Sequence, residues 1–407
     1  MPNINTLHLL EKLAELRASG AITEEEFNAE KSRLLQAPPQ GRTASGQQAA
    51  SPPRDSSPPG SASAPSNPLL DFITTRLGLE RIEQFSLSHL FSETFTRHQP
   101  EEIENIFSVG SSMTTPALND EMKKFPTPWV FFRVFIAGLL LFVLFSAMVY
   151  TTQNIKLLPG AMILGSFTMP LVTLLLFFEL NTPRNVSIYR VFSFVLAGGT
   201  VSLLLTLILN ATTDLYSILG SGAAGILEES AKLATVIFLL ALLPVNYYPY
   251  RLNALLLGAA VGTGFAAFES IGYVLLYGFQ EKGAINLERM MIVTITRAVF
   301  TPLCHIAWTA ITSAAYWAAR RKHGSAFEAL TSAEFLKLFA APVLLHFTWN
   351  SLGNVSWWWH FTLGFIAWVI IISLVQSGLK DIENQLQAAD ARADEEKSST
   401  ADQIERV

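Results

Sequence analysis

Long apolar runs fill the chain from Pro128 onward. They lie near residues 129–151, 157–179, 189–209, 219–243, 252–279, 290–318, 334–353 and 358–377. Each run is close to the roughly 20 apolar residues that cross a bilayer as a helix. The pattern therefore predicts an all-α membrane protein, with a polytopic bundle of about eight transmembrane helices over residues 128–378.

The residues before and after these runs are more polar. In residues 1–36, apolar positions at helical spacing stop at Gly20 and restart after a Thr23–Glu26 capping box, which predicts a small helical hairpin. Residues 37–68 are rich in Pro, Ser, Gly and Ala, and they predict a disordered linker because they offer little apolar surface to bury. Residues 69–127 predict short cytoplasmic juxtamembrane helices, and residues 379–407 predict a charged cytoplasmic tail.

Composition and charge agree with a membrane protein. At 50% hydrophobic residues, the 407-residue chain is too apolar for an ordinary soluble domain. A net charge of −5 without a basic stripe gives no indication of nucleic-acid binding. The one cysteine, Cys304, lies in an apolar run, so neither an intrachain disulfide nor a zinc site built on several thiolates is expected.

Ionisable residues inside the predicted spans are the candidates for chemistry. They are Glu228, Glu229 and Lys232 in the fourth run, Glu269 in the fifth, Arg297 and His305 in the sixth, and His346 in the seventh. Each charge at membrane depth costs about 2.5–3.5 kcal/mol even on the most lenient scale, which favours a functional reason for its presence.

The depths of these residues are similar. At about 1.5 Å per residue, Glu228 lies about 14 Å from the outer end of its helix, Glu269 about 15 Å, His305 about 22 Å and His346 about 10 Å. Glu228 and Lys232 are four residues apart, as are His346 and Asn350, so each pair shares a helix face. We expect a polar pocket between mid-bilayer and the outer surface.

Two kinds of chemistry are open for such a pocket. Imidazole and carboxylate are suitable zinc ligands, and an open coordination position would supply an activated water. Lys232, one turn after Glu228, would otherwise be the cation that lets two neighbouring carboxylates ionise together. The residues alone leave open whether zinc or the glutamates activate the water.

The motifs in these runs resemble a known family. "EESAK" fits E-E-x-x-K, "FAAFE" fits F-x-x-x-E and "HFTWN" fits H-x-x-x-[DN], in the order found in PrsW-type intramembrane proteases. "RAVFTPLCHIAWTA" around His305 is similar to the family's third helix. The family is distantly related to the CAAX prenyl endopeptidases, whose second motif has His where this chain has Glu269. The amino-terminal hairpin, with its "ITEEEF", resembles the SHOCT module.

The resemblance implies an intramembrane endopeptidase with zinc as the candidate cofactor. Glu228 and Glu229 would be the catalytic glutamates, one of them the general base or a metal ligand, and His346 with Asn350 would stabilise the oxyanion. The full prediction is a catalytic set of Glu228, Glu229, Lys232, Glu269, His346 and Asn350, and a metal-ligand set of Glu229, Glu269, His305 and His346.

The family also implies a setting. The predicted substrate is a membrane-anchored protein, with an anti-sigma factor as the implied class, cut near the outer face of the bacterial inner membrane. The SHOCT-like hairpin is predicted to have a cytoplasmic partner. Trp357, Trp358, Trp359 and His360 are interpreted as an interfacial aromatic belt, and Glu179 as a charge that snorkels from a span end.

Two other functions fit the buried charges less well. A proton- or ion-coupled transporter also uses intramembrane carboxylates and histidines, but neither an inverted repeat nor a pair of broken helices is evident in the two halves. A scaffold that displays the hairpin to partners has no reason to carry charges at a common depth.

The first testable prediction concerns topology. With both termini in the cytoplasm, ten loop cations face inward: Lys123, Lys124, Arg184, Arg190, Arg251, Arg320, Arg321, Lys322, Lys337 and Lys380. Three face outward: Lys156, Lys282 and Arg289. Reporters inserted near residue 40 and fused after Val407 should both score as cytoplasmic, and a periplasmic signal at either place would overturn this orientation.

Overall fold

The computed structural model describes residues 68–80, 85–243, 247–279, 285–353 and 356–405. Within these ranges the secondary structure is helical and no β-strand occurs, which confirms the predicted all-α class. The predicted hairpin at 1–36 and all but the last residue of the predicted linker lie outside the described residues.

Short helices precede the first long one. They are α3 (Pro68–Leu77), α4 (Leu87–Leu90), α5 (Pro100–Phe107) and η1 (Asp120–Lys123). Glu102 closes a capping box with Gln99 at the start of α5, next to a proline at the first helical position, so this helix begins where the sequence specifies.

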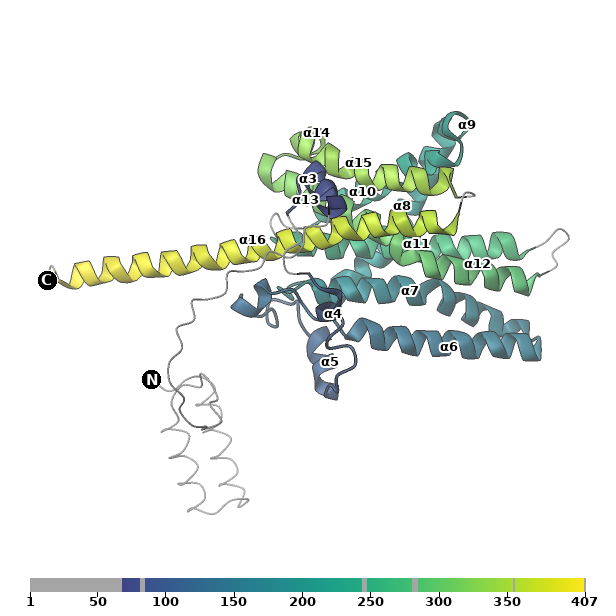
Figure 1. Ribbon diagram of the computed structural model, residues 1–407, viewed down its shortest axis with the longest axis horizontal. Helices are drawn as coiled ribbons and strands as arrows, with labels where there is room; N and C mark the ends of the chain where they lie inside the picture. Colours follow the sequence, from purple (N-terminus) through teal and green to yellow (C-terminus); the bar gives the residue numbers. More distant parts are fainter. Residues whose placement is uncertain (1–67, 81–84, 244–246, 280–284, 354–355, 406–407) are drawn as a thin grey trace, which may run out of the picture. The chain divides into compact units, whose positions relative to one another are not determined.

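Six helical segments among the described residues are long and apolar enough to cross a membrane (Figure 1). They are α6 (Val130–Thr152), η2 with α7 (Ile155–Leu157, Leu158–Leu180), α8 (Ile188–Thr212), α11 (Arg251–Gly278), α12–η5–α13 (Leu287–Phe300, Thr301–Leu303, His305–His323) and the first part of α16 (Trp357–Glu405).

Two further predicted spans form helices of 19 residues each, α10 (Ala223–Ala241) and α15 (Ala333–Ser351). Such a helix is about 28 Å long, close to the thickness of the hydrocarbon core. Their apolar character is reduced by the residues of interest, three charges on α10 and His346 and Asn350 on α15. Eight spans therefore remain a prediction. Between the long helices lie α9 (Leu215–Leu219), η3 (Gly220–Gly222) and α14 (Ala326–Thr331).

The sixth predicted span is not a continuous helix. It ends as α12 at Phe300, turns through the short η5, and restarts as α13 at His305. Pro302 lacks the N–H that would continue the ladder, and Cys304 leaves the helical conformation at φ −125° and ψ −115°. Trp368 of α16 donates from Nε1 to the freed Pro302 carbonyl at 2.9 Å. His305 thus begins a helix instead of lying in the middle of one.

Helix α11 is the most deeply buried of the candidate spans. Its glycines let neighbouring helices approach closely: a Cβ on Gly264 would lie 2.0 Å from the Val195 carbonyl oxygen of α8, and one on Gly262 2.7 Å from the His305 carbonyl oxygen of α13. Small residues allow such crossings in membranes, where packing itself holds helices together. The crossing of α11 and α13 fixes the position of His305.

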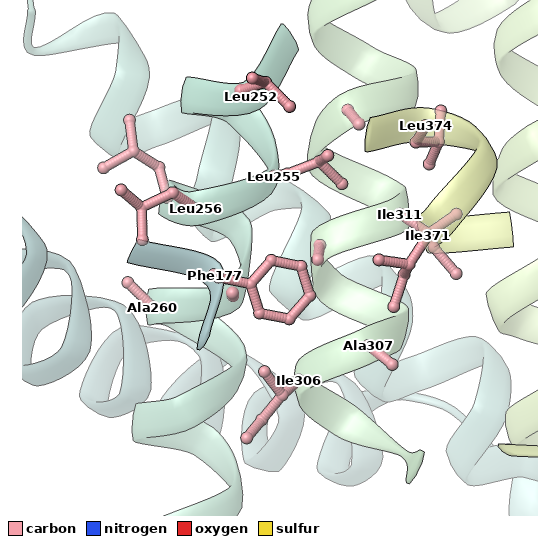
Figure 2. Packing of buried hydrophobic residues seen from close by; sticks show 14 of the residues in the cluster. Phe177, Leu252, Leu255, Leu256, Ala260, Ile306, Ala307, Ile311, Ile371 and Leu374 are labelled. Atoms are coloured by element: carbon pink, nitrogen blue, oxygen red, sulfur yellow. The ribbon is translucent and has the colours of Figure 1, made fainter. Parts of the chain in front are cut away.

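Apolar side chains from several helices form the main core, and those of α7, α11, α13 and α16 meet at its centre. Phe177 of α7 lies among Leu255 and Leu256 of α11, Ile306 and Ile311 of α13, and Ile371 of α16 (Figure 2). All of these side chains are almost completely buried. The core lies beside the polar residues of α10, α11 and α13 and gives them a rigid support.

Glu179, at the end of α7, caps the start of the preceding helix, α6. Its carboxylate accepts hydrogen bonds from the backbone N–H groups of Trp129, Val130 and Phe131 at 2.7–3.0 Å. These groups begin α6 and have no partner within the helix. Glu179 is therefore a structural cap, and its interpretation as a snorkelling charge was wrong.

The last helix, α16, runs from Trp357 to Glu405 without a break. The predicted charged tail is therefore helical as far as it is described. Side chains from Asn384 to Ala393 are exposed except for the partly buried Leu386, so this part of α16 continues beyond the bundle (Figure 1).

The contacts of His98 attach the segment before α5 to the start of α6. The His98 ring lies parallel to the Trp129 ring with centroids 3.7 Å apart. His98 Nδ1 is 2.7 Å from Glu102 Oε2, and Nε2 is 2.9 Å from the Glu93 carbonyl oxygen. Trp129 has a second contact, because the Arg133 guanidinium lies 4.4 Å from the centre of its ring.

These contacts predict a pH-dependent attachment. Burial lowers the pKa of His98, but hydrogen bonds to the Glu93 carbonyl and the Glu102 carboxylate outweigh it and Arg133, so the pKa is raised overall. A raised folded pKa stabilises the protein below the ordinary value of about 6.5, and this contribution is lost as pH rises through the folded value. The melting temperature of the wild type should exceed that of His98→Gln more at pH 6 than at pH 8. Equal differences at both pH values would contradict the prediction.

Candidate active site

Three charged residues of α10 form the base of the site. Lys232 and Glu229 are both 0% exposed, and Lys232 Nζ lies 2.6 Å from Glu229 Oε1. Glu228 Oε2 is farther from the ammonium group, at 3.8 Å. A buried ion pair at this distance offsets part of the desolvation of both groups, so Glu229 is the main counter-charge of Lys232.

The ammonium group of Lys232 has two further neighbours. It lies 3.1 Å from His305 Nδ1 and 4.4 Å from the centre of the Phe265 ring. Phe265 is the aromatic residue of the F-x-x-x-E pattern on α11, so that residue covers the buried charge by a cation–π contact. Lys232 is thereby held between α10, α11 and α13.

His346 of α15 is oriented by Glu229. Its Nδ1 lies 2.9 Å from Glu229 Oε1, a distance at which the imidazole donates to the carboxylate. In the tautomer that this contact requires, Nε2 is free, and it lies 3.7 Å from Glu228 Oε2. The Trp308 ring stacks on the His346 ring at 4.5 Å and fixes its plane.

His305 is oriented in the same way by Glu269 of α11. His305 Nε2 lies 3.1 Å from Glu269 Oε2, and Nδ1 faces Glu228 Oε2 at 3.8 Å. The same Glu269 oxygen pairs with Arg297 of α12, which also donates from Nε to Ser270 Oγ at 2.8 Å. The Arg297 guanidinium lies 4.4 Å from the Tyr273 ring, so its charge is enclosed by α11.

Glu228, His305 and His346 form a group that fits a metal ion. Their ligand atoms lie within 4.8 Å of one another. Glu228 Oε2 is buried and has no hydrogen-bond partner among the described residues, as is also true of Glu229 Oε2, although buried carboxylate oxygens are normally satisfied. Two imidazole nitrogens and a carboxylate oxygen are a zinc donor set, and tetrahedral zinc ligands lie about 3.4 Å apart, so small shifts would close the group.

The group differs from the predicted metal set in its carboxylate. His305 and His346 belong to it, whereas Glu229 and Glu269 hold these histidines from behind. Carboxylates that orient metal-binding histidines in this way are common at zinc sites. Lys232 contacts the same His305 nitrogen that a metal would use, so binding of a metal there would require the ammonium group to keep Glu229 and release His305.

A cavity of about 470 Å³ opens onto this group. Five of the residues predicted to form the site line it: Glu228, Glu269, His305, His346 and Asn350. Glu229 and Lys232, the other two, lie behind the lining and are fully buried. The structure thus brings the predicted residues of four helices to one place, and it divides them into a layer that faces the cavity and a layer that supports it.

Several residues of the cavity were not predicted as site residues. They are Tyr216, Ser221, Tyr273, Arg297, Phe300, Trp349, Trp357 and His360, among others. Arg297 was recognised as a charge inside a predicted span, but it was not assigned to the catalytic or the metal-ligand set. Trp357 and His360 could not be distinguished from an interfacial aromatic belt by their sequence, since both arrangements place aromatic residues at a helix end.

The chain was compared with known families, curated proteins and solved structures. Residues 186–375 match the PrsW family intramembrane metalloprotease, and residues 9–35 match SHOCT, described as a short C-terminal domain, here near the amino terminus. The first match contains every predicted site residue. The searches of curated proteins and of solved structures found no significant match.

The pairing of Lys232 predicts different stabilities for two adjacent variants. Glu229→Gln leaves the buried ammonium group without its main counter-charge and should destabilise the fold by about 3–5 kcal/mol. Glu228→Gln should have little effect, because Glu228 Oε2 has no hydrogen-bond partner to lose. Melting temperatures of the purified variants measure the difference, and adding Lys232→Met to Glu229→Gln should restore most of the loss. Equal melting temperatures for the two single variants would refute this pairing.

Proposed function

We propose that the chain is an intramembrane protease of the PrsW type, the family that residues 186–375 match, and that its cavity is the active site in which a membrane-anchored protein is cut. Glu228, His305 and His346 would hold the metal ion, for which zinc is the candidate. The family match leaves open the identity of the metal, the roles of single residues and the substrate.

One observation carries this proposal. Glu228 Oε2, which has no hydrogen bond to the described residues, faces one nitrogen from each of two histidines, and the other nitrogen of each histidine is held by a different carboxylate. A packing contact does not require both imidazoles to be fixed in this way. At zinc sites such support fixes the tautomer and the direction of each ligand.

The residues around the group have distinct tasks. Zinc, when bound, would supply Lewis acidity and an activated water. Glu269 and Glu229 hold His305 and His346 in the required tautomers, and Lys232 is the counter-charge of Glu229. Asn350 lines the cavity one turn after His346, where its side-chain amide can donate to the oxyanion that develops on the scissile carbonyl.

A glutamic-type reaction without metal is the alternative. The contact of Lys232 with His305 Nδ1 favours it, because the ammonium group occupies the neighbourhood of that nitrogen. In this case Glu228 would itself accept the proton of the attacking water. Glu228 is essential in both mechanisms, whereas only the first one requires a metal.

The substrate and its location follow from the predicted orientation. The depth of the site favours cleavage of a single-span protein near the outer face of the bacterial inner membrane, and an anti-sigma factor is the class implied by the family resemblance. The SHOCT module at residues 9–35 would bind a partner on the cytoplasmic side.

The assignment of the cavity as a protease site can be tested without a known substrate, by comparing cleavage by the wild type with cleavage by Glu228→Gln. Membranes of host cells that express either form are compared by mass spectrometry of new protein termini. Termini near apolar segments should appear with the wild type, and Glu228→Gln should reduce them by about 10²–10⁴-fold. Glu288→Gln, an exposed glutamate of α12 outside the cavity, is the matched control and should behave as wild type. Identical termini with Glu228→Gln would refute the protease site.

The metal content of the same purified proteins separates the two mechanisms. We expect about one zinc per chain in the wild type and in Glu288→Gln, and its loss from His346→Ala, as measured by elemental mass spectrometry. Cleavage that persists after complete removal of metal would favour the glutamic-type reaction.

A further inference from the structure

Four rings form an aromatic wall in the lining of the cavity. Phe300 from the end of α12, Trp349 of α15, and Trp357 and His360 from the start of α16 all line the cavity. Resting on the function proposed above, we propose that this aromatic wall is a substrate subsite for an aromatic side chain, on the residue that supplies the scissile carbonyl.

The position of the wall follows from the spacing on α15. Trp349 comes three residues after His346 and directly before Asn350, so it lies on the next turn of the same helix. A carbonyl placed between His346 and Asn350 would carry its own side chain toward Trp349. Trp308 stacks on His346 and contacts Trp349 edge-to-face at 5.6 Å, which makes the polar floor and the aromatic wall continuous.

The rings of the wall are arranged to receive another ring. Phe300 lies 5.5 Å from Trp349, 6.2 Å from Trp357 and 5.2 Å from His360, in edge-on or tilted contacts. In such contacts an aromatic side chain of a substrate gains binding free energy beyond the contribution of the apolar area that it buries. Trp357 borders the cavity and is 70% exposed, so its ring is not packed inside the bundle.

The charges near the wall exclude other substrate side chains. Arg297 and Glu269, which also line the cavity, are paired with each other. A charged substrate side chain on the wall would therefore lose its hydration without gaining a partner, which is unfavourable. A small side chain would leave the rings uncovered. An aromatic side chain fits both conditions.

The test uses two chelating probes that differ only in this side chain, the hydroxamates of N-acetylphenylalanine and N-acetylalanine. Their affinities for the zinc-loaded, full-length protein in detergent are measured by calorimetry. The phenylalanine compound should bind about 10- to 100-fold more tightly to the wild type, as expected for burial of one ring.

Variants locate that preference on the wall. Trp357→Ala removes an exposed residue and should not disturb folding, and Phe300→Ala removes the central ring. Each should reduce the preference to less than about threefold, because the buried apolar area is lost. Trp358→Ala is the matched control, since Trp358 is 79% exposed on the same helix but does not line the cavity. Equal affinities in the wild type, or a preference unchanged in both wall variants, would overturn the subsite.

The primary amides of the same two amino acids separate this result from a failure of the metal site. Hydroxamates that bind no more tightly than these amides would refute the zinc site. The subsite is then judged on the amides by Trp fluorescence: a preference for the phenylalanine amide that Phe300→Ala abolishes supports the wall, and no preference overturns it.

Discussion

Burial of the Lys232 charge is the constraint on which the site depends. An ammonium group with no exposed surface must have a counter-charge, and Glu229 supplies it at 2.6 Å. That contact commits one oxygen of Glu229, and the same oxygen accepts from His346. Glu229 is therefore drawn away from the cavity, and the adjacent Glu228 is left to face it. The two glutamates of one motif receive different environments from a single buried cation.

The break between α12 and α13 has a related effect. In a continuous span, His305 would lie within a regular helix, and both its backbone N–H and its C=O would be hydrogen-bonded within that helix. The turn at Thr301–Leu303 instead brings Arg297 and His305 to the same carboxylate, that of Glu269. Backbone exposed by a break at membrane depth must find partners within the protein, and Trp368 provides one. Interrupted helices also occur in transporters, but residues 186–375 match a family of intramembrane metalloproteases.

Much of the fold and part of the site could be predicted from the sequence. Apolar runs identified the helices, and the motifs identified which helix faces meet, because spacing in a helix determines direction. The spacing did not show whether Glu228 or Glu229 faces the cavity. Adjacent residues of a helix point in different directions, and which direction meets the cavity depends on contacts with other helices. Pro302 was visible within the sixth run, yet Pro170 and Pro342 lie inside α7 and α15 without ending them, so proline alone does not identify a break.

The continuity of α16 links two parts of the chain that the sequence presents as separate. Trp357 and His360 border the cavity at one end of this helix, and the exposed arm lies at the other. A helix of 49 residues is about 74 Å long at 1.5 Å per residue. Rigid secondary elements of this kind transmit displacement along their length. A force applied to the exposed carboxyl-terminal part of α16 would thus be transmitted along the helix to the rings near Glu228, His305 and His346.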